Sequence, residues 1–387
     1  MNQKPATPPV AWIETTASLE ALAPRWKAAR RLAVDTEANG FHAYRPRTCL
    51  IQVAWEEAGG ARCVLVDPLA LGGRLGPLAE RLEDPGQEKI LHGADNDVRL
   101  LARDCDVSLR GLVDTQICAR LAGFARTGLV PLAAALLDAR LSKAGQRLDW
   151  ARRPLDRRAM DYAASDAMLL LPLREALVSR LRAMGRWAWA EEECRLLEKV
   201  RMGPEKPVDP YQLASRLKGA GALDGQARRV LLALVAWREE QARAIDRPAH
   251  FLVEPRTLLN LARQRPRSFE ALSRAGLPPQ ACRRWGSRLL ELIRDPPPPP
   301  PRLPRPARAP RPEIPAPRLE ALKALRRRKA EELGLEEGTV LPTAVLREVA
   351  REPAGSPADL LARGMRQWQV GVLGKAILAL GDDLSGT

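Results

Sequence analysis

The residues that decide the fold are RLAVDTEANGFHAYRPRTCLIQV, from Arg31 to Val53. Apolar runs at Leu32–Val34 and Cys49–Val53 predict two buried strands at the ends of this stretch. Asp35 and Glu37 follow the first run, and the two-residue side-chain period of a strand puts both carboxylates on one face. Two acids that repel each other there indicate a divalent cation site, because hard cations prefer carboxylate oxygens. The alternative is a solvated strand end, since Asp-x-Glu is a short and frequent pattern.

Two later segments carry further acids at fixed spacings. In KILHGADNDV, residues 89–98, His92 precedes Asp97 in the pattern HxxxxD after an apolar run. In DYAASDAMLL, residues 161–170, Tyr162 and Asp166 are four apart, so on a helix they share one face. The order DxE, HxxxxD, YxxxD resembles the DEDD 3′–5′ exonucleases with tyrosine in the third motif. More closely, it resembles the ribonuclease D family.

The flanking residues support this resemblance, which covers nearly the whole chain. They are Asp114-Thr115-Gln116, Lys143, Asp149-Trp150 and Arg153-Pro154-Leu155. Each motif is weak alone, but their common order is specific. The chain departs from the family pattern at Ala38, where an aromatic residue is common, and at Ala159, where glutamine is common. These departures leave the proposed metal ligands intact and put the details of substrate contact in doubt.

The resemblance implies a ribonuclease-H-like α/β exonuclease domain with a mixed sheet and a two-metal site. Asp35 would bridge two divalent ions, Mg²⁺ or Mn²⁺, which lie about 3.5–4 Å apart in such sites. Glu37, Asp97 and Asp166 would complete the site, and Glu37 would also contact the 3′ end of the substrate. Tyr162 would orient the attacking water, because a phenol of pKa about 10 is a poor base. The alternative for Tyr162 is a core tyrosine with a satisfied hydroxyl group.

Other polar residues near these motifs have more ordinary interpretations. His92 is expected to be a packed or hydrogen-bonding residue, and the family spacing selects Asp97 over Asp95. Cap, turn or packing roles are expected for Asp104, Asp106 and Asp114. The candidate substrate contacts are His42, Lys143, Trp150 and Arg153, through phosphate contact and stacking. For the region from Lys143 to Arg153 the alternative is a salt-bridged loop with Trp150 in the core.

Composition favours a nucleic-acid partner and a reducing compartment. The 387 residues carry a formal net charge of +15, which suits a polyanion, although an Arg-rich composition alone could also produce it. The six cysteines form no CxxC pair and the three histidines are far apart, so structural zinc is not expected. The start MNQKPATPP does not resemble a signal peptide, and no apolar run approaches the ~20 residues needed to cross a membrane. We therefore expect a cytoplasmic protein, and we expect it to be a monomer.

The chain divides into an exonuclease domain at residues 1–205 and helical segments beyond it. Within the first domain, strands are expected at 9–15, around Leu32, Ile51 and Leu65 as an antiparallel meander, at 89–91 and at 112–113. Helices are expected at 18–30, 95–103, from 115 to 121 and at 156–186. Residues 206–295 resemble the helicase-and-RNase-D C-terminal (HRDC) domain, on Trp237-Arg238-Glu239, Ala242, Arg247-Pro248, Leu258, Leu261-Ala262 and Pro266. Residues 318–387 resemble a second, diverged copy.

Between the two helical domains, residues 296–317 form a Pro- and Arg-rich linker. Proline at this density predicts polyproline II, which has three residues per turn. Arginines at every third position would then form a stripe along one side and could follow an RNA backbone; these are Arg302, Arg305, Arg308 and Arg311. The alternative is a simple spacer.

Together these features predict a metal-dependent 3′–5′ exoribonuclease that releases 5′-mononucleotides. By resemblance, its substrates would be the 3′ ends of tRNA precursors and other small stable RNAs. Two alternatives stay open at this point. One is a DNA 3′–5′ exonuclease of the helicase-associated type, and the other is a non-catalytic RNA-binding protein on the same scaffold. The intact acidic quartet argues against the second.

Overall fold

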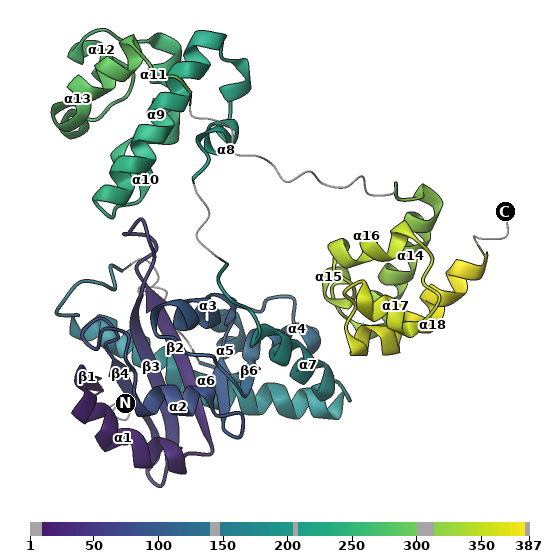
Figure 1. The fold of residues 1–387 in the computed structure, drawn as a ribbon. Coiled ribbons are helices and arrows are strands. Elements are labelled where there is room, and N and C mark those ends of the chain that lie inside the picture. The colour runs from purple at the N-terminus through teal and green to yellow at the C-terminus, as the bar shows by residue number, and fades with distance from the viewer. Residues whose placement is uncertain (1–9, 140–147, 204–207, 300–312, 384–387) are drawn as a thin grey trace. The chain divides into compact units, whose positions relative to one another are not determined.

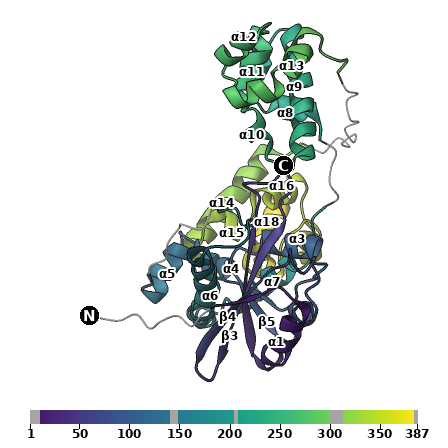
Figure 2. The same ribbon diagram turned by 90° about the vertical axis from the view of Figure 1, so that its left-hand side faces the viewer.

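A computed structural model of the protein describes residues 10–139, 148–203, 208–299 and 313–383 (Figures 1 and 2). Lys143 and the linker arginines Arg302, Arg305, Arg308 and Arg311 lie outside these residues. The chain forms two compact units: one comprises Met1–Ala38, Thr48–Met202 and Ala309–Thr387, and the other Asn39–Arg47 and Gly203–Arg308. Among the described helices, none is both long and apolar enough to cross a membrane.

The first unit is built on a six-stranded mixed sheet of order β1-β4-β3-β2-β5-β6. The strands are β1 (Ala11–Ile13), β2 (Arg31–Ala38), β3 (Thr48–Glu57), β4 (Gly60–Val66), β5 (Glu88–Leu91) and β6 (Leu112–Asp114). Strand β3 runs antiparallel to both β2 and β4, which confirms the predicted meander. The pairs β1–β4, β2–β5 and β5–β6 are parallel. Buried residues fill both faces of the central strands, as expected for a sheet that helices cover.

Among the described residues of this domain, seven helices accompany the sheet. They are α1 (Thr16–Ala28), α2 (Pro77–Glu83), α3 (Asp95–Asp104), α4 (Thr115–Leu121), α5 (Leu129–Leu137), α6 (Arg157–Ala183) and α7 (Trp187–Leu197). The long helix α6 packs across β2, β3 and β4. Its start is fixed by Asp156, whose carboxylate accepts a hydrogen bond from the Ala159 N–H at 2.7 Å. Such a cap satisfies an N–H that has no partner within the helix. It also fixes the residue at which α6 begins, and therefore which of its side chains face the sheet.

The second helical copy packs against α7 within the same unit. It comprises α14 (Ala316–Leu333), α15 (Glu337–Val340), α16 (Thr343–Arg351), α17 (Pro357–Ala362) and α18 (Gln367–Asp383). The Trp189 and Trp368 rings stack with centroids 4.8 Å apart. The Glu192 carboxylate accepts from the N–H groups of Gln367 and Trp368 at 2.7 and 3.0 Å, and so caps α18 from another domain. The Trp368 indole N–H donates to Glu193 at 2.9 Å.

The second unit is a helical domain with its own apolar core. It contains α8 (Pro210–Ser215), the 3₁₀ turn η1 (Ala220–Ala222), α9 (Gly225–Ala244), α10 (Ala249–Leu252), α11 (Pro255–Gln264), α12 (Phe269–Arg274) and α13 (Pro279–Arg294). Loop residues 39–47 belong to this unit, which the sequence did not predict. The Tyr44 hydroxyl lies 3.2 Å from Glu239 on α9, and the Tyr44 and Arg45 N–H groups donate to Asp246 at 3.2 Å.

Candidate active site

Strand β2 presents Asp35 and Glu37 from the middle of the sheet. Their β3 partners are Gln52 and Leu50, so the two acids lie two positions apart and share a face. Burial raises the pKa of Glu37 to about 9, and the nearby carboxylates of Asp35, Asp166 and Asp97 add to the shift. Burial also raises the pKa of Asp35 well above its usual range, again with contributions from Asp97 and Asp166. Negative charge is therefore concentrated on this face of β2.

Helix α3 supplies Asp97 from its first turn. The Thr36 hydroxyl on β2 donates a hydrogen bond to the Asp97 carboxylate, which fixes the two elements together. Burial raises the pKa of Asp97 to about 6 despite this bond. Asp95 instead forms a two-point ion pair with Arg99 one turn later, at 2.9 and 3.1 Å. The contacts of Asp95 thus agree with the choice of Asp97 from the family spacing.

Helix α6 supplies Tyr162 and Asp166 from the same face, as the four-residue spacing predicts. The Tyr162 hydroxyl hydrogen-bonds Asp166, and burial together with this carboxylate raises the pKa of the phenol. Burial raises the pKa of Asp166 to about 6. The Tyr162 ring stacks on Trp150 with centroids 6.3 Å apart, and Trp150 is only 1% exposed. The phenol is therefore held by a buried indole on one side and a carboxylate on the other.

The four acids are electrostatic neighbours, but their carboxylates do not converge on a point. Among the described residues, no three acidic, histidine or cysteine side chains are arranged closely enough to hold an ion together. The interactions that shift the pKa values of Asp35 and Glu37 come from burial, other acids and one backbone N–H. No lysine or arginine from the described residues is among them. Two half-buried carboxylates thus lie together without a compensating cation from these residues.

His92 is a hydrogen-bonding residue, as its position predicts. Its Nδ1 lies 2.9 Å from the Thr115 hydroxyl, which donates to the Leu91 carbonyl at 2.9 Å. Asp114 is almost completely buried and accepts from the N–H groups of Gly93, Ala94, Gln116 and Ile117. This carboxylate holds the β5–α3 connection against the start of α4. It thereby positions the helix turn that carries Asp97.

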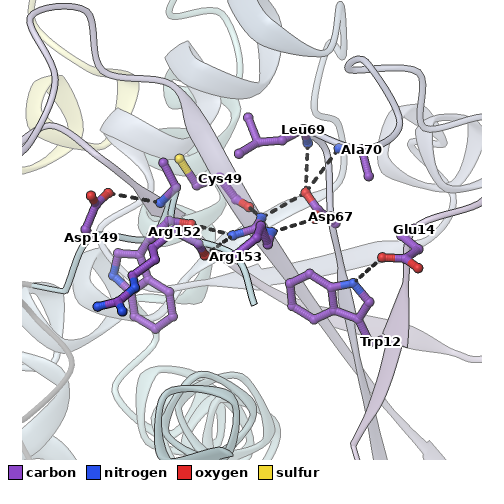
Figure 3. Close-up of polar contacts among 11 residues, drawn as sticks. Trp12, Glu14, Cys49, Asp67, Leu69, Ala70, Asp149, Arg152 and Arg153 are labelled. Carbon is purple, nitrogen blue, oxygen red and sulfur yellow. Dashed lines mark hydrogen bonds and ion pairs between the residues drawn. The ribbon is translucent and has the colours of Figure 1, made fainter. Parts of the chain in front are cut away.

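Arg153 is bound within the protein on all sides of its guanidinium group (Figure 3). Its Nε and Nη2 donate to the two oxygens of Asp67 at 2.7 and 2.8 Å, and Nη2 also donates to the Cys49 carbonyl. Its Nη1 donates to the Trp150 carbonyl at 2.8 Å, and the group lies 5.0 Å from the centre of the Trp12 ring. These contacts, with the burial of Trp150, favour the structural alternative for both residues.

The remaining candidates are less defined. His42 lies in loop 39–47, where its N–H donates to the Asn39 carbonyl at 2.8 Å. Its proposed substrate contact stays a prediction, as does that of Lys143. Sequence reasoning missed Thr36, although its position between the two acids of Asp-x-Glu offered a signal.

A six-stranded mixed sheet that places paired acids on β2 beside acids from α3 and α6 defines a nuclease of the ribonuclease-H-like class. A family profile described as 3′-5′ exonuclease matches residues 10–182, and the HRDC profile matches residues 227–293 and 316–380. Curated relatives named ribonuclease D include that of Pseudomonas paraeruginosa, which is 33% identical over 96% of this chain and 97% of its own. The chain belongs to the ribonuclease D family, whose activity is that of a 3′–5′ exoribonuclease.

Solved structures agree with this assignment. Escherichia coli RNase D, described as an exoribonuclease involved in structured RNA processing, shares 26% identity with a TM-score of 0.62. The alignment covers 97% of this chain and 99% of that one. The catalytic core of RRP6 from Trypanosoma brucei shares 26% identity with a TM-score of 0.68, covering 76% of this chain and 80% of that one. Both neighbours confirm the predicted ribonuclease-H-like fold, and the two HRDC matches confirm the predicted helical copies.

Proposed function

We propose that this exoribonuclease uses Asp35, Glu37, Asp97 and Asp166 to bind two divalent ions, Mg²⁺ or Mn²⁺. The observation that carries the proposal is the group of neighbouring, buried or half-buried carboxylates with raised pKa values and no compensating cation from the described residues. All four donors are carboxylates, which suits hard cations. Bound ions would supply a hydroxide nucleophile and stabilise the leaving oxygen.

The protein's own groups have distinct tasks in this proposal. Asp35 would help to hold both ions, and Glu37 would also contact the 3′-terminal nucleotide, as the family resemblance implies. Tyr162 keeps its proton at neutral pH because its pKa is raised, so it acts as a hydrogen-bond donor and not as a base. Trp150 and Asp166 fix the orientation of this phenol. Tyr162 therefore positions the attacking water.

We infer further that the substrates are structured RNAs, among them tRNA precursors with 3′ extensions. The support is the family, two HRDC domains and the strongly basic chain. The test is digestion of a 3′-extended tRNA precursor and of a matched DNA oligomer with Mg²⁺ or Mn²⁺. The expected products are 5′-mononucleotides from the RNA, with none in EDTA. Faster cleavage of the DNA oligomer would contradict the choice of substrate.

A substitution tests the ligand assignment. Asp35→Asn or Asp97→Asn should abolish hydrolysis and leave RNA binding largely intact, because binding comes mostly from basic surfaces elsewhere. Asp95→Asn is the matched control, since Asp95 lies two residues from Asp97 and pairs only with Arg99 among the contacts described. We expect this control to keep wild-type turnover. Near wild-type turnover by purified Asp35→Asn protein would refute the metal site.

A further inference from the structure

Helices α11, α12 and α13 lie together in the first HRDC domain (Figure 1). A large groove opens where the end of α11 meets α12 and α13. It encloses about 960 Å³, and its lining includes Arg265, Arg267, Phe269 and Arg294. All of these residues belong to one compact unit, so the groove is a property of this domain alone. Its combination of an aromatic ring with several guanidinium groups calls for a ligand that has both flat rings and negative charge.

The Phe269 side chain is exposed, yet its position is fixed. It is 44% exposed, and one side of the ring lies against the backbone of Gly286 in the middle of α13. A Cβ atom at Gly286 would stand 2.6 Å from Cε1 of the ring, so only glycine permits this approach. Glycine inside a helix costs about 1 kcal/mol relative to alanine. Gly286 therefore weakens α13, but the absence of a side chain at this position leaves room for the Phe269 ring.

The backbone at Phe269 is anchored as well. Ser268 caps α12 by accepting a hydrogen bond from the Ala271 N–H at 3.3 Å. The Phe269 carbonyl accepts from the Cys282 thiol on α13 at 3.7 Å. The Cys282 thiol thus joins α13 to the start of α12 at the residue that carries the ring. A ring that is held in this way loses little conformational freedom when a flat ligand stacks on its exposed part.

The charges around the ring are mostly uncompensated. Arg267 and Arg294 are exposed, and neither guanidinium group has a hydrogen-bond or ion-pair partner among the described residues. Arg265 lies 3.9 Å from Asp224, a loose ion pair. The one acid in the lining, Glu291, is paired with Arg288 at 3.1 Å. The lining of the groove therefore combines net positive charge with an exposed aromatic ring.

We propose that this groove binds single-stranded RNA, with one base stacked on Phe269 and flanking phosphates on Arg267 and Arg294. The choice of RNA over other polyanions rests on the proposed function. Stacking on an aromatic side chain tolerates every base, and arginines beside it contact the backbone without sequence preference. An acidic peptide would use the arginines but would gain little from the ring. The groove thus holds unpaired RNA of any sequence.

The test measures the affinity of the full-length chain for a single-stranded RNA oligomer by fluorescence anisotropy. An Asp35→Asn background in EDTA prevents hydrolysis, so the result does not depend on catalysis. Phe269→Leu keeps an apolar contact with Gly286 but removes the aromatic face, and it should weaken binding by about 5- to 50-fold. Phe269→Tyr should restore the affinity. The matched control is Phe251→Ala, which removes a 55% exposed phenylalanine from the same domain and should bind RNA like the parent protein.

Two further variants separate the ring position from the charge. Gly286→Ala keeps Phe269 but displaces its ring, and it should weaken binding while helix content is unchanged or higher. Arg267→Gln with Arg294→Gln should reduce the slope of log affinity against log salt by about 1.4, the value for two lost phosphate contacts on single strands. Arg256→Gln is the control for a lost exposed arginine.

Equal affinity of Phe269→Leu and the parent protein would overturn the stacking role. An unchanged salt slope in the double arginine variant would overturn the phosphate contacts. If both variants bind RNA normally and lose an acidic peptide instead, the groove is a protein-binding site and the proposal is wrong. Failure of the proposed function would show separately, as absence of RNA hydrolysis by the unsubstituted chain in Mg²⁺ or Mn²⁺.

Discussion

Glu37 makes the metal-free protein sensitive to pH. Its pKa is about 9 in the folded chain and about 4.3 in an unfolded one. A raised carboxyl pKa means that the folded state keeps a proton that the unfolded state has released. The stabilising contribution is therefore complete below about pH 4 and is lost as the pH rises toward about 9. In EDTA, we expect Tm to fall by ~5–10 °C between about pH 6 and about pH 9.

Thermal melts followed by circular dichroism check this expectation. Glu37→Gln should reduce the fall in Tm, whereas the exposed control Glu20→Gln should not. Mg²⁺ or Mn²⁺ should restore Tm at about pH 8, because a bound cation favours the ionised carboxylates. The Asp35→Asn variant should show little of this rescue. A Tm that stays constant with pH in EDTA would mean that the carboxylates are already neutralised.

Tyr162 can be tested without disturbing the fold. Tyr162→Phe keeps the ring on Trp150 and removes only the hydroxyl that bonds Asp166. We expect kcat to fall by about 10²–10⁴-fold, the range for a positioned group in proton-transfer chemistry, with Tm nearly unchanged. The rate should show no new dependence on pH near neutrality, because the phenol is protonated throughout. A wild-type kcat would show that the Tyr162 hydroxyl has no role in catalysis and that the residue only packs.

For single residues, the sequence predicted which acids lie together better than it predicted the contacts that hold them in place. Strand and helix periodicity alone place Asp35 with Glu37 and Tyr162 with Asp166, because both pairs are local. The hydrogen bond from Thr36 to Asp97 joins residues 61 positions apart. Such a contact depends on how β2 and β5 pair, which periodicity does not specify.

Arg153 is the clearest case where one side chain holds several elements together. It joins the residue after β4, the start of β3 and the loop before α6 through Asp67, Cys49 and Trp150. Arg153→Ala would leave the buried Asp67 carboxylate without its cation, and we expect a loss of about 2–4 kcal/mol in the free energy of unfolding. Arg152→Ala is the control, since the neighbouring side chain is exposed. Denaturant unfolding measures both.

The same variant distinguishes the two interpretations of Arg153. If its role is structural, KM for RNA should stay within about twofold at temperatures where the variant is folded. If Arg153 binds phosphate, KM should rise and the salt dependence should weaken at unchanged stability. The contacts in Figure 3 favour the first outcome.

Most elements followed from local sequence, and the exceptions have a physical reason. Helix α4 spans Thr115–Leu121 and α6 spans Arg157–Ala183, close to the predicted ranges, because caps and apolar spacing are local signals. Loop 39–47 is different. Its Tyr44 contacts α9, some 195 residues away, and no local pattern reports a contact of that separation.

The compact units of the molecule do not follow the order of the domains along the chain. The second HRDC copy follows the first in sequence, yet it belongs to the compact unit of the exonuclease domain. Sequence patterns predicted the copy but gave no sign of its attachment to α7. That attachment includes a stacked tryptophan pair and two glutamates, and contacts of this kind carry no periodic signal.

The attachment should make the two domains unfold together. Trp368 is 6% exposed and packs in the core cluster of the exonuclease domain. Trp368→Ala should lower the Tm of the exonuclease domain by several degrees and split a shared transition into two. Differential scanning calorimetry would show this directly. Trp285→Ala, in the first HRDC domain, is the control and should leave that shared transition in place.

The contact between α7 and α18 also means that the peptide chain is not the only tie between these domains. If a protease site is placed between residues 299 and 313 and the chain is cut there, residues 313–387 should remain bound as a separate polypeptide. The same cut in a protein that carries Trp368→Ala should release the fragment on a sizing column. The enzyme could then be assembled from two chains made independently, with the stacked tryptophans and the Glu192 cap forming the interface between them.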